Sequence, residues 1–287
     1  MTGRRLKVLF LSYGVGLHQQ EVQFAVQCLQ LHQPVEPESI LVYTDTPHCF
    51  ASLPAQVVEI TSEQWRNWGG PRNFNHRRKI LALDHALQAF GQPVLLLDGD
   101  TWLRQPLSIL ESRIGPRRGV MHIREGQISR VQSPLYDQLR QLLQSSAGQA
   151  TLIPVDAWMW NAGVIGLHPE QRSLLQEVLR LTDLLCEHSS LHILEQLAFS
   201  VVLSRNIQLQ EAADVVFHYW PPYLHKPFRQ RLPVIMTQAS LLPESRQAAF
   251  LYSHRPRPGL GRRCKVICKR LLESIGLLRG YCRSNEW

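Results

Sequence analysis

The sequence lacks any apolar run close to the roughly 18 residues that a membrane-spanning helix needs. It also lacks the roughly 7–15-residue apolar core of a signal peptide, because the apolar run near its start is only Val8–Leu11. These absences argue against a membrane-spanning protein and against an exported one, so we expect a cytoplasmic location. Without an export signal, free thiols are the expected state of the six cysteines.

Charged side chains are also few, at 19% of the 287 residues, whereas hydrophobic residues make up 44%. This balance excludes a disordered chain and indicates a globular protein with a sizeable core. The sequence contains no internal repeat and no low-complexity segment. Its length suits one large domain or two small ones.

The net charge of +8 is concentrated near the end of the sequence. Residues 254–287 contain nine Lys and Arg against two Glu, which leaves 22 basic and 21 acidic residues elsewhere. We therefore divide the chain into a body, residues 1–253, and a basic tail, residues 254–287. Aromatic residues do not interleave with the basic residues of this tail, which argues against a nucleic-acid partner.

Apolar strands alternate with amphipathic helices along the body. We expect strands at 6–11, 40–45, 57–60, 93–97, 119–122, 164–167 and 215–217, and helices at 18–31, 76–90, 134–145, 169–187 and 191–203. This alternation predicts an α/β fold with a mixed, mainly parallel, Rossmann-like sheet flanked by helices. The strand at 93–97 is apolar throughout, so we expect it to be central. Ligands of such sheets bind beyond the carboxyl ends of the strands.

Two carboxylates, those of Asp98 and Asp100, follow this strand with only Gly99 between them. Side chains at positions i and i+2 of an extended backbone point the same way, so the two carboxylates should converge. Like charges repel strongly at such range unless a cation lies between them. Mg²⁺ and Mn²⁺ prefer oxygen ligands of this kind and bridge to phosphate oxygens. The alternative is that Asp98 and Asp100 only form an Asp-Gly turn.

The ordered set of motifs resembles that of nucleotide-sugar glycosyltransferases with the GT-A fold, and of glycosyltransferase family 8 and its relatives. Asp98–Asp100 resembles the D-x-D motif, and Trp160–Val164 resembles the F-N-[AS]-G-V segment. Glu195–Gln196 is similar to the Asp-Gln pair that follows in that family. Phe217–Phe228 is loosely similar to the late H-x-x-G-x-K-P-W signature. The order and spacing agree over about residues 6–230.

The resemblance implies a metal-dependent transferase with a nucleoside-diphosphate sugar, usually a UDP-sugar, as its donor. The acceptor would be a hydroxyl group of a glycan or of a lipid-linked saccharide. Asp98, Asp100 and His218 would hold Mn²⁺ or Mg²⁺. A neutral imidazole is a plausible ligand beside two carboxylates. The alternative for His218 is a histidine at a strand end that is capped by water.

The resemblance also implies that Asn161 faces the donor sugar or the acceptor, and that Glu195 and Gln196 lie near the transferring carbon. The alternatives are a turn asparagine and a solvated helix start. Likeness to family 8 implies retention of the anomeric configuration, whereas an inverting enzyme needs a carboxylate base. Asp156 or Glu195 could serve as that base, so the residues leave the stereochemistry open.

Further donor-binding residues are expected in three segments of the sequence. Cations at a helix start oppose the helix dipole, so an anion that compensates them is favourable there, although a solvated basic turn explains them as well. The turn after the first strand, with Ser12 and Gly14, and Asp45 at the end of the second strand would shape the pocket for the nucleotide base. The resemblance implies that Lys226 contacts phosphate. The candidates are Ser12, Gly14, Asp45, Arg78, Lys79, Asp98 and Lys226.

The sequence departs from the family pattern in three places. Leu197 stands where an acidic residue usually follows the Asp-Gln pair, Phe228 replaces a tryptophan, and the glycine before Lys226 is missing. These departures motivate an alternative function, a non-catalytic binding protein on the same fold that recruits a partner or a membrane through its tail.

Residues 264–279 of the tail are predicted to form an amphipathic helix. Its apolar face and clustered basic residues fit a helix that lies on an anionic membrane surface. Such a helix would make the protein a peripheral membrane protein. The alternative is a terminal helix that docks on the body with a solvated basic face.

Overall fold

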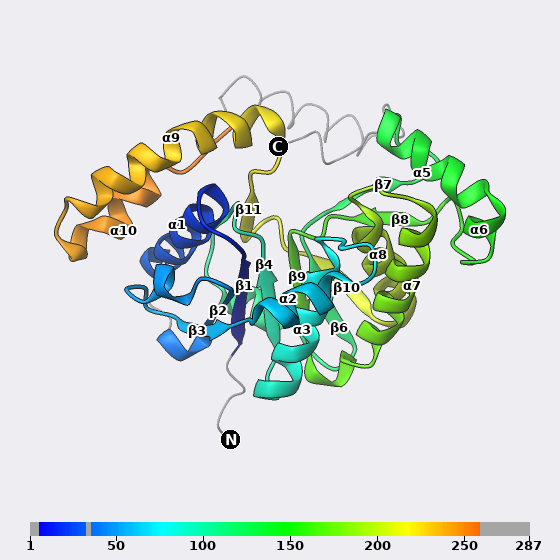
Figure 1. Ribbon diagram of the computed structural model, residues 1–287, viewed down its shortest axis with the longest axis horizontal. Coiled ribbons are helices and arrows are strands. Elements are labelled where there is room, and N and C mark those ends of the chain that lie inside the picture. Colours follow the sequence, from blue (N-terminus) through cyan, green and yellow to red (C-terminus); the bar gives the residue numbers. More distant parts are fainter. Residues whose placement is uncertain (1–5, 33–35, 259–287) are drawn as a thin grey trace.

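The computed structural model describes residues 6–32 and 36–258 (Figure 1). The predicted basic tail therefore lies outside the described residues except for 254–258. The amphipathic helix predicted at 264–279 lies wholly outside them. Within the described residues, no helix combines the length and the apolar character needed to cross a membrane.

A mixed, mainly parallel sheet forms the centre of the molecule. Its strands are β1 (Lys7–Ser12), β2 (Ile40–Thr44), β3 (Gln56–Glu59), β4 (Val94–Leu97), β6 (Arg118–Met121), β9 (Val164–Leu167) and β10 (Gln208–Glu211). The described strands of this seven-stranded sheet follow the order β10-β6-β9-β4-β1-β2-β3. β9 runs antiparallel to its neighbours β4 and β6, and the other neighbouring pairs are parallel. This arrangement confirms the predicted fold class.

Strand β4 is central, as its composition predicts. It lies fourth of seven in the sheet, and each of its four residues is buried. Val94 and Leu96 join the core on one face of the sheet, whereas Leu95 and Leu97 join the core on the other. A strand that is covered on both faces has no solvent-facing side chain, which explains why this run contains no polar residue.

Helices cover both faces of the sheet. The described helices are α1 (Leu17–His32), α2 (Ser62–Gly69), α3 (Arg77–Phe90), α4 (Ser108–Arg113), α5 (Pro134–Gln144), α6 (Ser146–Gln149), α7 (Leu174–His188), α8 (Leu194–Asn206), α9 (Pro222–Ser240) and α10 (Glu244–Ser253). Apolar side chains of α1 and α4 pack on one face. Those of α3, α7 and α8 pack on the other. The molecule therefore has three layers.

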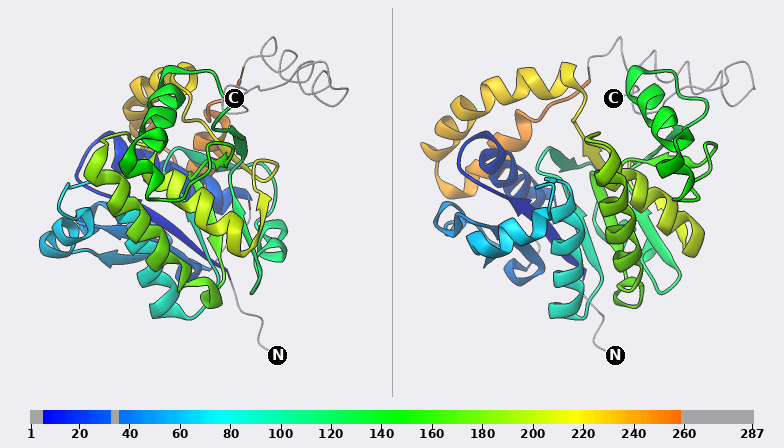
Figure 2. Two further views of the ribbon diagram at one scale, coloured as in Figure 1. Left: turned by 90° about the vertical axis from the view of Figure 1, so that its right-hand side faces the viewer. Right: turned by 45° about the vertical axis from the view of Figure 1, so that its right-hand side comes forward.

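Two helical groups rise above the carboxyl ends of the parallel strands. α9 and α10 lie beside α1 on one side, and α5 and α6 lie on the other (Figure 1). The right-hand view of Figure 2 keeps the same two groups on either side of this edge. The carboxyl edge of the sheet is thus flanked by helices, at the place where ligands of such sheets bind.

Two small antiparallel sheets form at the same edge. β5 (Thr101–Leu103) pairs with β11 (Val216–His218), and His218 lies opposite Thr101. β7 (Arg124–Gln127) pairs with β8 (Trp158–Trp160). The first pair brings residue 218 next to the D-x-D segment, and the second leads the chain into Asn161.

Replacing Leu96 in β4 by alanine should destabilise the protein strongly, since its side chain is only 1% exposed. A large-to-small change in a packed core typically costs about 2–5 kcal/mol of unfolding free energy. Urea unfolding followed by circular dichroism measures this cost. Leu241, which is 80% exposed, is the control. A loss for Leu96→Ala no larger than that for Leu241→Ala would contradict the assignment of β4 as the core strand.

Candidate active site

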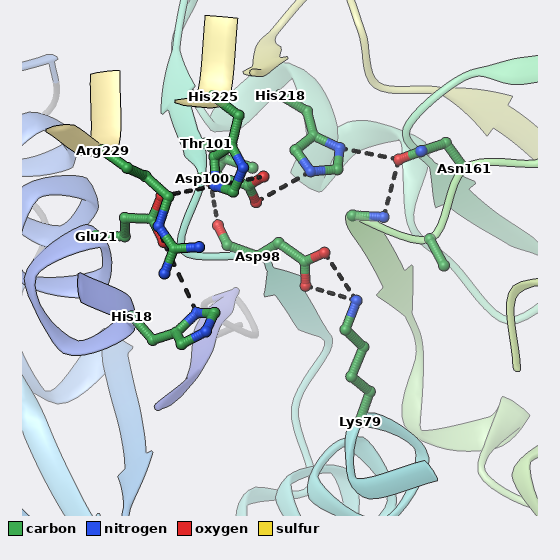
Figure 3. Close-up of polar contacts among 12 residues, drawn as sticks. His18, Glu21, Lys79, Asp98, Asp100, Thr101, Asn161, His218, His225 and Arg229 are labelled. Carbon is green, nitrogen blue, oxygen red and sulfur yellow. Dashed lines mark hydrogen bonds and ion pairs between the residues drawn. The ribbon is translucent and has the colours of Figure 1, made fainter. Parts of the chain in front are cut away.

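The D-x-D segment turns sharply where β4 ends. The Asp98 backbone N–H donates to the Gly163 carbonyl at 2.9 Å, and the Thr101 hydroxyl donates to the Asp98 carbonyl at 2.7 Å. A Cβ atom at Gly99 would lie 3.0 Å from a methyl carbon of Val22 in α1, so this position favours glycine. The Asp98 and Asp100 side chains enter the same space (Figure 3).

Lys79 from α3 provides the counter-charge of Asp98. Its Nζ lies 2.7 Å from one carboxylate oxygen of Asp98 and 2.8 Å from the other. Burial alone would lower the pKa of Lys79, but the charges of Asp98 and Glu195 outweigh burial and raise it. Lys79 is therefore a fixed cation at the D-x-D motif, and the alternative of a solvated basic turn is wrong for this residue.

His218 provides the counter-charge of Asp100. Its Nε2 lies 3.0 Å from Asp100 Oδ1. Burial would raise the pKa of Asp100, but His218 outweighs burial and holds this pKa below its usual range. Burial would lower the pKa of His218, and Asp100 in turn raises it. One ligand atom each from Asp98, Asp100 and His218 lies within 4.8 Å of the others, which is a set that can hold a metal ion.

The segment that resembles F-N-[AS]-G-V fixes the position of the His218 ring through Asn161 and Gly163. Its Nδ1 lies 3.0 Å from Asn161 Oδ1 (Figure 3). The same oxygen accepts a hydrogen bond from the Gly163 backbone N–H at 3.0 Å. A Cβ atom at Gly163 would lie 2.1 Å from Cε1 of the ring. Only glycine fits at this position of the motif, because the imidazole occupies the space that a side chain would fill.

A buried carboxylate that the sequence analysis missed, that of Glu125 in β7, lies next to Asn161. It accepts hydrogen bonds from Asn161 Nδ2 at 3.1 Å, from the Tyr136 hydroxyl at 2.9 Å and from Gln196 Nε2 at 3.1 Å. Burial raises its pKa, and these three donors counteract part of that effect. Glu125 belongs to no recognisable motif and lies in a part of the sequence without regular strand or helix periodicity. The sequence therefore gives no indication that it lies in the site.

Glu195 and Gln196 begin α8 at the same place. Glu195 is 2% exposed, so the alternative of a solvated helix start is wrong for it. Its Oε1 lies 3.8 Å from Lys79 Nζ and 3.9 Å from His76 Nδ1. Burial raises the pKa of Glu195 to about 7, although Lys79 acts in the opposite direction. Burial, followed by the charge of Lys79, lowers the pKa of His76 to about 4.

Two cavities meet at the D-x-D motif. The large cavity has a volume of about 410 Å³ and the small cavity about 170 Å³. Both are lined by His76, Lys79, Asp98 and Asp100. Other walls of the large cavity come from Glu125, Tyr136, Asn161, Glu195, Gln196, His218 and Trp220. Those of the small cavity come from Tyr13, His18, Glu21, Asn75 and His225. The shared wall carries both acidic residues and the lysine.

Basic side chains gather around Glu21 at the small cavity. His225 Nε2 lies 2.9 Å from Glu21 Oε1. The other carboxylate oxygen of Glu21, Oε2, lies 3.5 Å from Arg229 Nε and 3.8 Å from His18 Nδ1. His225 Nε2 also lies 3.9 Å from Asp100 Oδ2. His225 and Arg229 come from α9, so this helix brings basic groups to the D-x-D motif (Figure 3).

The remaining candidates lie in different surroundings. Gly14 N donates to Asp45 Oδ1 at 2.7 Å, which joins the turn after β1 to the end of β2. Ser12 is buried at the end of β1. None of these three residues, which were expected to shape the base pocket, lines either cavity. Arg78, Asp156 and Lys226 do not line either cavity. The Arg78 guanidinium donates to the Trp65 carbonyl and to the Asn73 and Asn75 side chains, and Asp156 and Lys226 are exposed.

Two departures from the family pattern have structural explanations. Leu197 is fully buried in the core beneath α8, where a carboxylate would be costly. Phe228 packs edge-on against Phe24 and Tyr219, at ring-centroid distances of 5.0 Å in both cases. The side chains at both positions therefore contribute to packing.

The fold is that of known glycosyltransferases. The galactosyltransferase LgtC, solved with donor and acceptor sugar analogues, is 12% identical, with a TM-score of 0.52 over 84% of this chain and 99% of that chain. GlyE from Streptococcus pneumoniae is 14% identical, with a TM-score of 0.49 over 89% and 66%. Mouse xyloside xylosyltransferase 1 is 13% identical, with a TM-score of 0.43 over 72% and 84%. No family model and no curated protein matches the sequence. The likeness to LgtC confirms the predicted GT-A fold.

Replacing Gly163 by alanine should force the His218 ring out of its place, because the new methyl group would overlap it. Overpacking of this kind typically costs about 1–3 kcal/mol of unfolding free energy. Urea unfolding measures the loss. Gly115→Ala is the matched control, since its Cβ would meet Arg118 only at an ordinary 3.6 Å. Equal effects of the two substitutions would contradict the tight packing of His218 on Gly163.

Glu195→Gln should stabilise the protein at high pH. A carboxylate whose pKa rises from 4.5 to about 7 on folding binds more protons in the folded state between these values, so its contribution to stability falls as pH rises through them. We expect the variant to gain up to about 3 kcal/mol of unfolding free energy at pH 8 and almost nothing at pH 4.5.

Urea unfolding in EDTA at the two pH values measures this difference. Glu177→Gln is the control, since Glu177 is exposed on α7. A gain for Glu195→Gln that does not depend on pH would contradict the burial of an ionised Glu195.

Proposed function

We propose that the protein is a glycosyltransferase that transfers a sugar from a UDP-sugar to a hydroxyl group of a glycan or of a lipid-linked saccharide. The observation that carries this proposal is the convergence of Asp98, Asp100 and His218 where the two cavities meet. A nucleotide sugar has two parts that are joined by a diphosphate. Two cavities with a shared wall that can hold a cation suit such a molecule, and so does a fold shared with LgtC.

The donor set of Asp98, Asp100 and His218 fits Mn²⁺ or Mg²⁺. Carboxylates are the preferred ligands of both ions, and an imidazole nitrogen completes a set that Mn²⁺ accepts. The lowered pKa of Asp100 keeps its carboxylate ionised at neutral pH, which is the form that binds metal. When bound, the ion supplies positive charge that stabilises the diphosphate leaving group.

We assign the nucleoside to the small cavity and the transferred sugar to the large one. In the small cavity, the Tyr13 ring packs against His18 and Trp65 at centroid distances of 5.4 and 5.1 Å. This aromatic surface suits a nucleobase. In the large cavity, the amide and carboxyl groups of Asn161, Gln196 and Glu195 suit sugar hydroxyl groups.

The chain's own cations stabilise the charge that develops during transfer. As the bond between sugar and diphosphate breaks, negative charge grows on the leaving phosphate. Lys79 lies at the shared wall, and Arg229 lies beside the small cavity. Fixed positive charge in a site with little water is usually the largest contribution of an enzyme to such a reaction.

The acceptor hydroxyl must lose a proton as it attacks the sugar. In an attack from the face opposite the diphosphate, which inverts the anomeric carbon, Glu195 with its pKa of about 7 can accept this proton. In an attack from the same face, which retains the configuration, the departing diphosphate accepts it. For the stereochemistry, we propose retention of the anomeric configuration, on the resemblance to family 8. The anomeric coupling constant of the product in proton NMR checks this outcome.

We further propose that the enzyme is cytoplasmic and attaches peripherally to an anionic membrane through the basic tail, residues 254–287. Its charge supports this proposal. The start of the tail is tied to β5, since the Trp102 Nε1–H donates to the Pro256 carbonyl at 3.2 Å and Arg255 stacks on Trp102 at 4.8 Å.

The Asp98→Asn and Asp100→Asn variants test the proposed reaction. Each removes a negative charge from the ligand set with almost no change of shape, so we expect at least a 100-fold loss of UDP-sugar turnover with Mn²⁺. A panel of UDP-sugars is assayed for UDP release. The same panel in thermal-shift assays should raise the melting temperature of the wild type when Mn²⁺ is present.

Asp137→Asn is the control, because Asp137 is an exposed residue of α5. Turnover that persists in both active-site variants would overturn the proposed reaction. A wild type that neither turns over UDP-sugars nor binds them in the presence of Mn²⁺ would instead support the non-catalytic binding protein.

A further inference from the structure

Glu125 has no part in the reaction as described above, although the residue is only 4% exposed and its carboxylate accepts a hydrogen bond from Asn161. We propose that Glu125 is a positioning residue that acts through Asn161 to orient His218 for metal binding. This inference rests on the proposed function, because it concerns the proposed metal site.

Glu125 and Gly163 together fix the orientation of the Asn161 amide. Asn161 turns its NH₂ group toward Glu125, and Glu125 Oε1 accepts a hydrogen bond from Asn161 Nδ2 at 3.1 Å. The amide oxygen then faces the opposite way. A second contact supports this orientation, because the Gly163 backbone N–H can only donate and lies 3.0 Å from that oxygen.

The Asn161 amide in turn orients the imidazole of His218. Asn161 Oδ1 lies 3.0 Å from His218 Nδ1, and an amide oxygen only accepts, so Nδ1 must be the donor. Nε2 then faces Asp100 Oδ1 at 3.0 Å. It donates to this oxygen in the imidazolium form, and in the neutral form it is the nitrogen whose lone pair can bind a metal ion. Glu125 thus sets, through one amide, which nitrogen of His218 serves as ligand.

Glu125 is itself held in place by further hydrogen bonds. Its other oxygen, Oε2, accepts from the Tyr136 hydroxyl at 2.9 Å and from Gln196 Nε2 at 3.1 Å. Gln196 is fixed in turn, because its Oε1 accepts from the Ala162 backbone N–H at 3.2 Å. The carboxylate is therefore held from α5 and from α8. All three of its side-chain donors are neutral, so this buried group is costly to keep, and a positioning task explains its presence.

Hydrogen-bond partners behind a histidine ligand typically change metal affinity by about 10–100-fold. We therefore expect Glu125→Met, which has similar size but accepts no strong hydrogen bond, to weaken Mn²⁺ binding by about that factor. Glu125→Gln should restore affinity to within about threefold of the wild type, because its amide oxygen can still accept from Asn161 Nδ2. Glu177→Met is the matched control, since it makes the same substitution at an exposed position of α7.

The experiment measures the Mn²⁺ dissociation constant of the full chain, without nucleotide, by electron paramagnetic resonance. Pulsed measurements on protein with ¹⁵N-labelled histidine then detect the nitrogen bound to Mn²⁺. The nitrogen signal should be present in the wild type, Glu125→Gln and Glu177→Met, absent in His218→Ala, and weakened in Glu125→Met. A merely structural role of Glu125 would lower the melting temperature without removing this signal.

A double-substitution cycle tests the route through Asn161. If Glu125 acts through Asn161, adding Glu125→Met to Asn161→Ala should weaken Mn²⁺ binding no further. If Glu125→Met does not fold, Glu125→Asp replaces it, because the shorter carboxylate cannot reach Asn161 in the same way. We expect it to weaken Mn²⁺ binding by about threefold or more.

The outcomes separate this inference from the proposed function. A wild type that binds Mn²⁺ with a nitrogen signal, together with a Glu125→Met variant that does the same with equal affinity, overturns the positioning role and leaves the proposed function intact. Additive effects in the cycle overturn the route through Asn161. A wild type that binds no Mn²⁺ overturns the proposed metal site and this inference together.

Discussion

The site depends on the repulsion between two carboxylates that the fold brings together at the end of its central strand. Asp98 and Asp100 are separated by one residue and enter one space. The protein balances them with two different groups, the ammonium of Lys79 and the imidazole of His218. A divalent cation between the two carboxylates would relieve the same repulsion. The arrangement is thus that of a cation site whose ligands are held in place by neighbouring charges.

The position of each group follows from the packing of the sheet. β4 is buried on both faces, so its end is a rigid support for the D-x-D turn. The antiparallel strand β9 places Gly163 beside Asp98, and the pairing of β5 with β11 places His218 beside the same turn. Residues that are more than 50 positions apart in the sequence therefore meet within hydrogen-bond distance.

The central part of the site was predictable from the sequence, because it follows recognisable elements. An apolar run marks β4, and Asp98, Asp100, Asn161 and His218 each stand directly before or after a short strand or at its last residue. The choice between Arg78 and Lys79 was not predictable. Neighbouring residues of a helix point about 100° apart, and the rotation of α3 in the fold decides which of them faces Asp98. Lys79 reaches the carboxylate, whereas Arg78 bonds to α2 and the turn that follows it.

Other features carry no signal in the sequence for physical reasons. Glu125 and Glu21 are single acidic residues whose importance comes only from tertiary neighbours. α9 was missed because Pro227 and Pro233 lie inside it, and proline normally ends a helix. The basic groups of α9 at the small cavity, His225 and Arg229, were missed with it. Lys226, which was predicted for that place, lies on the exposed side of the same helix.

The most direct measurement of the central claim is an anomalous difference map from crystals that contain Mn²⁺ and UDP. The account predicts one strong manganese peak within bonding distance of the Asp98 and Asp100 carboxylates and of His218 Nε2. It also predicts UDP density that extends from this peak into the small cavity. A map with no peak there, or with a peak bound by other residues, would contradict the account.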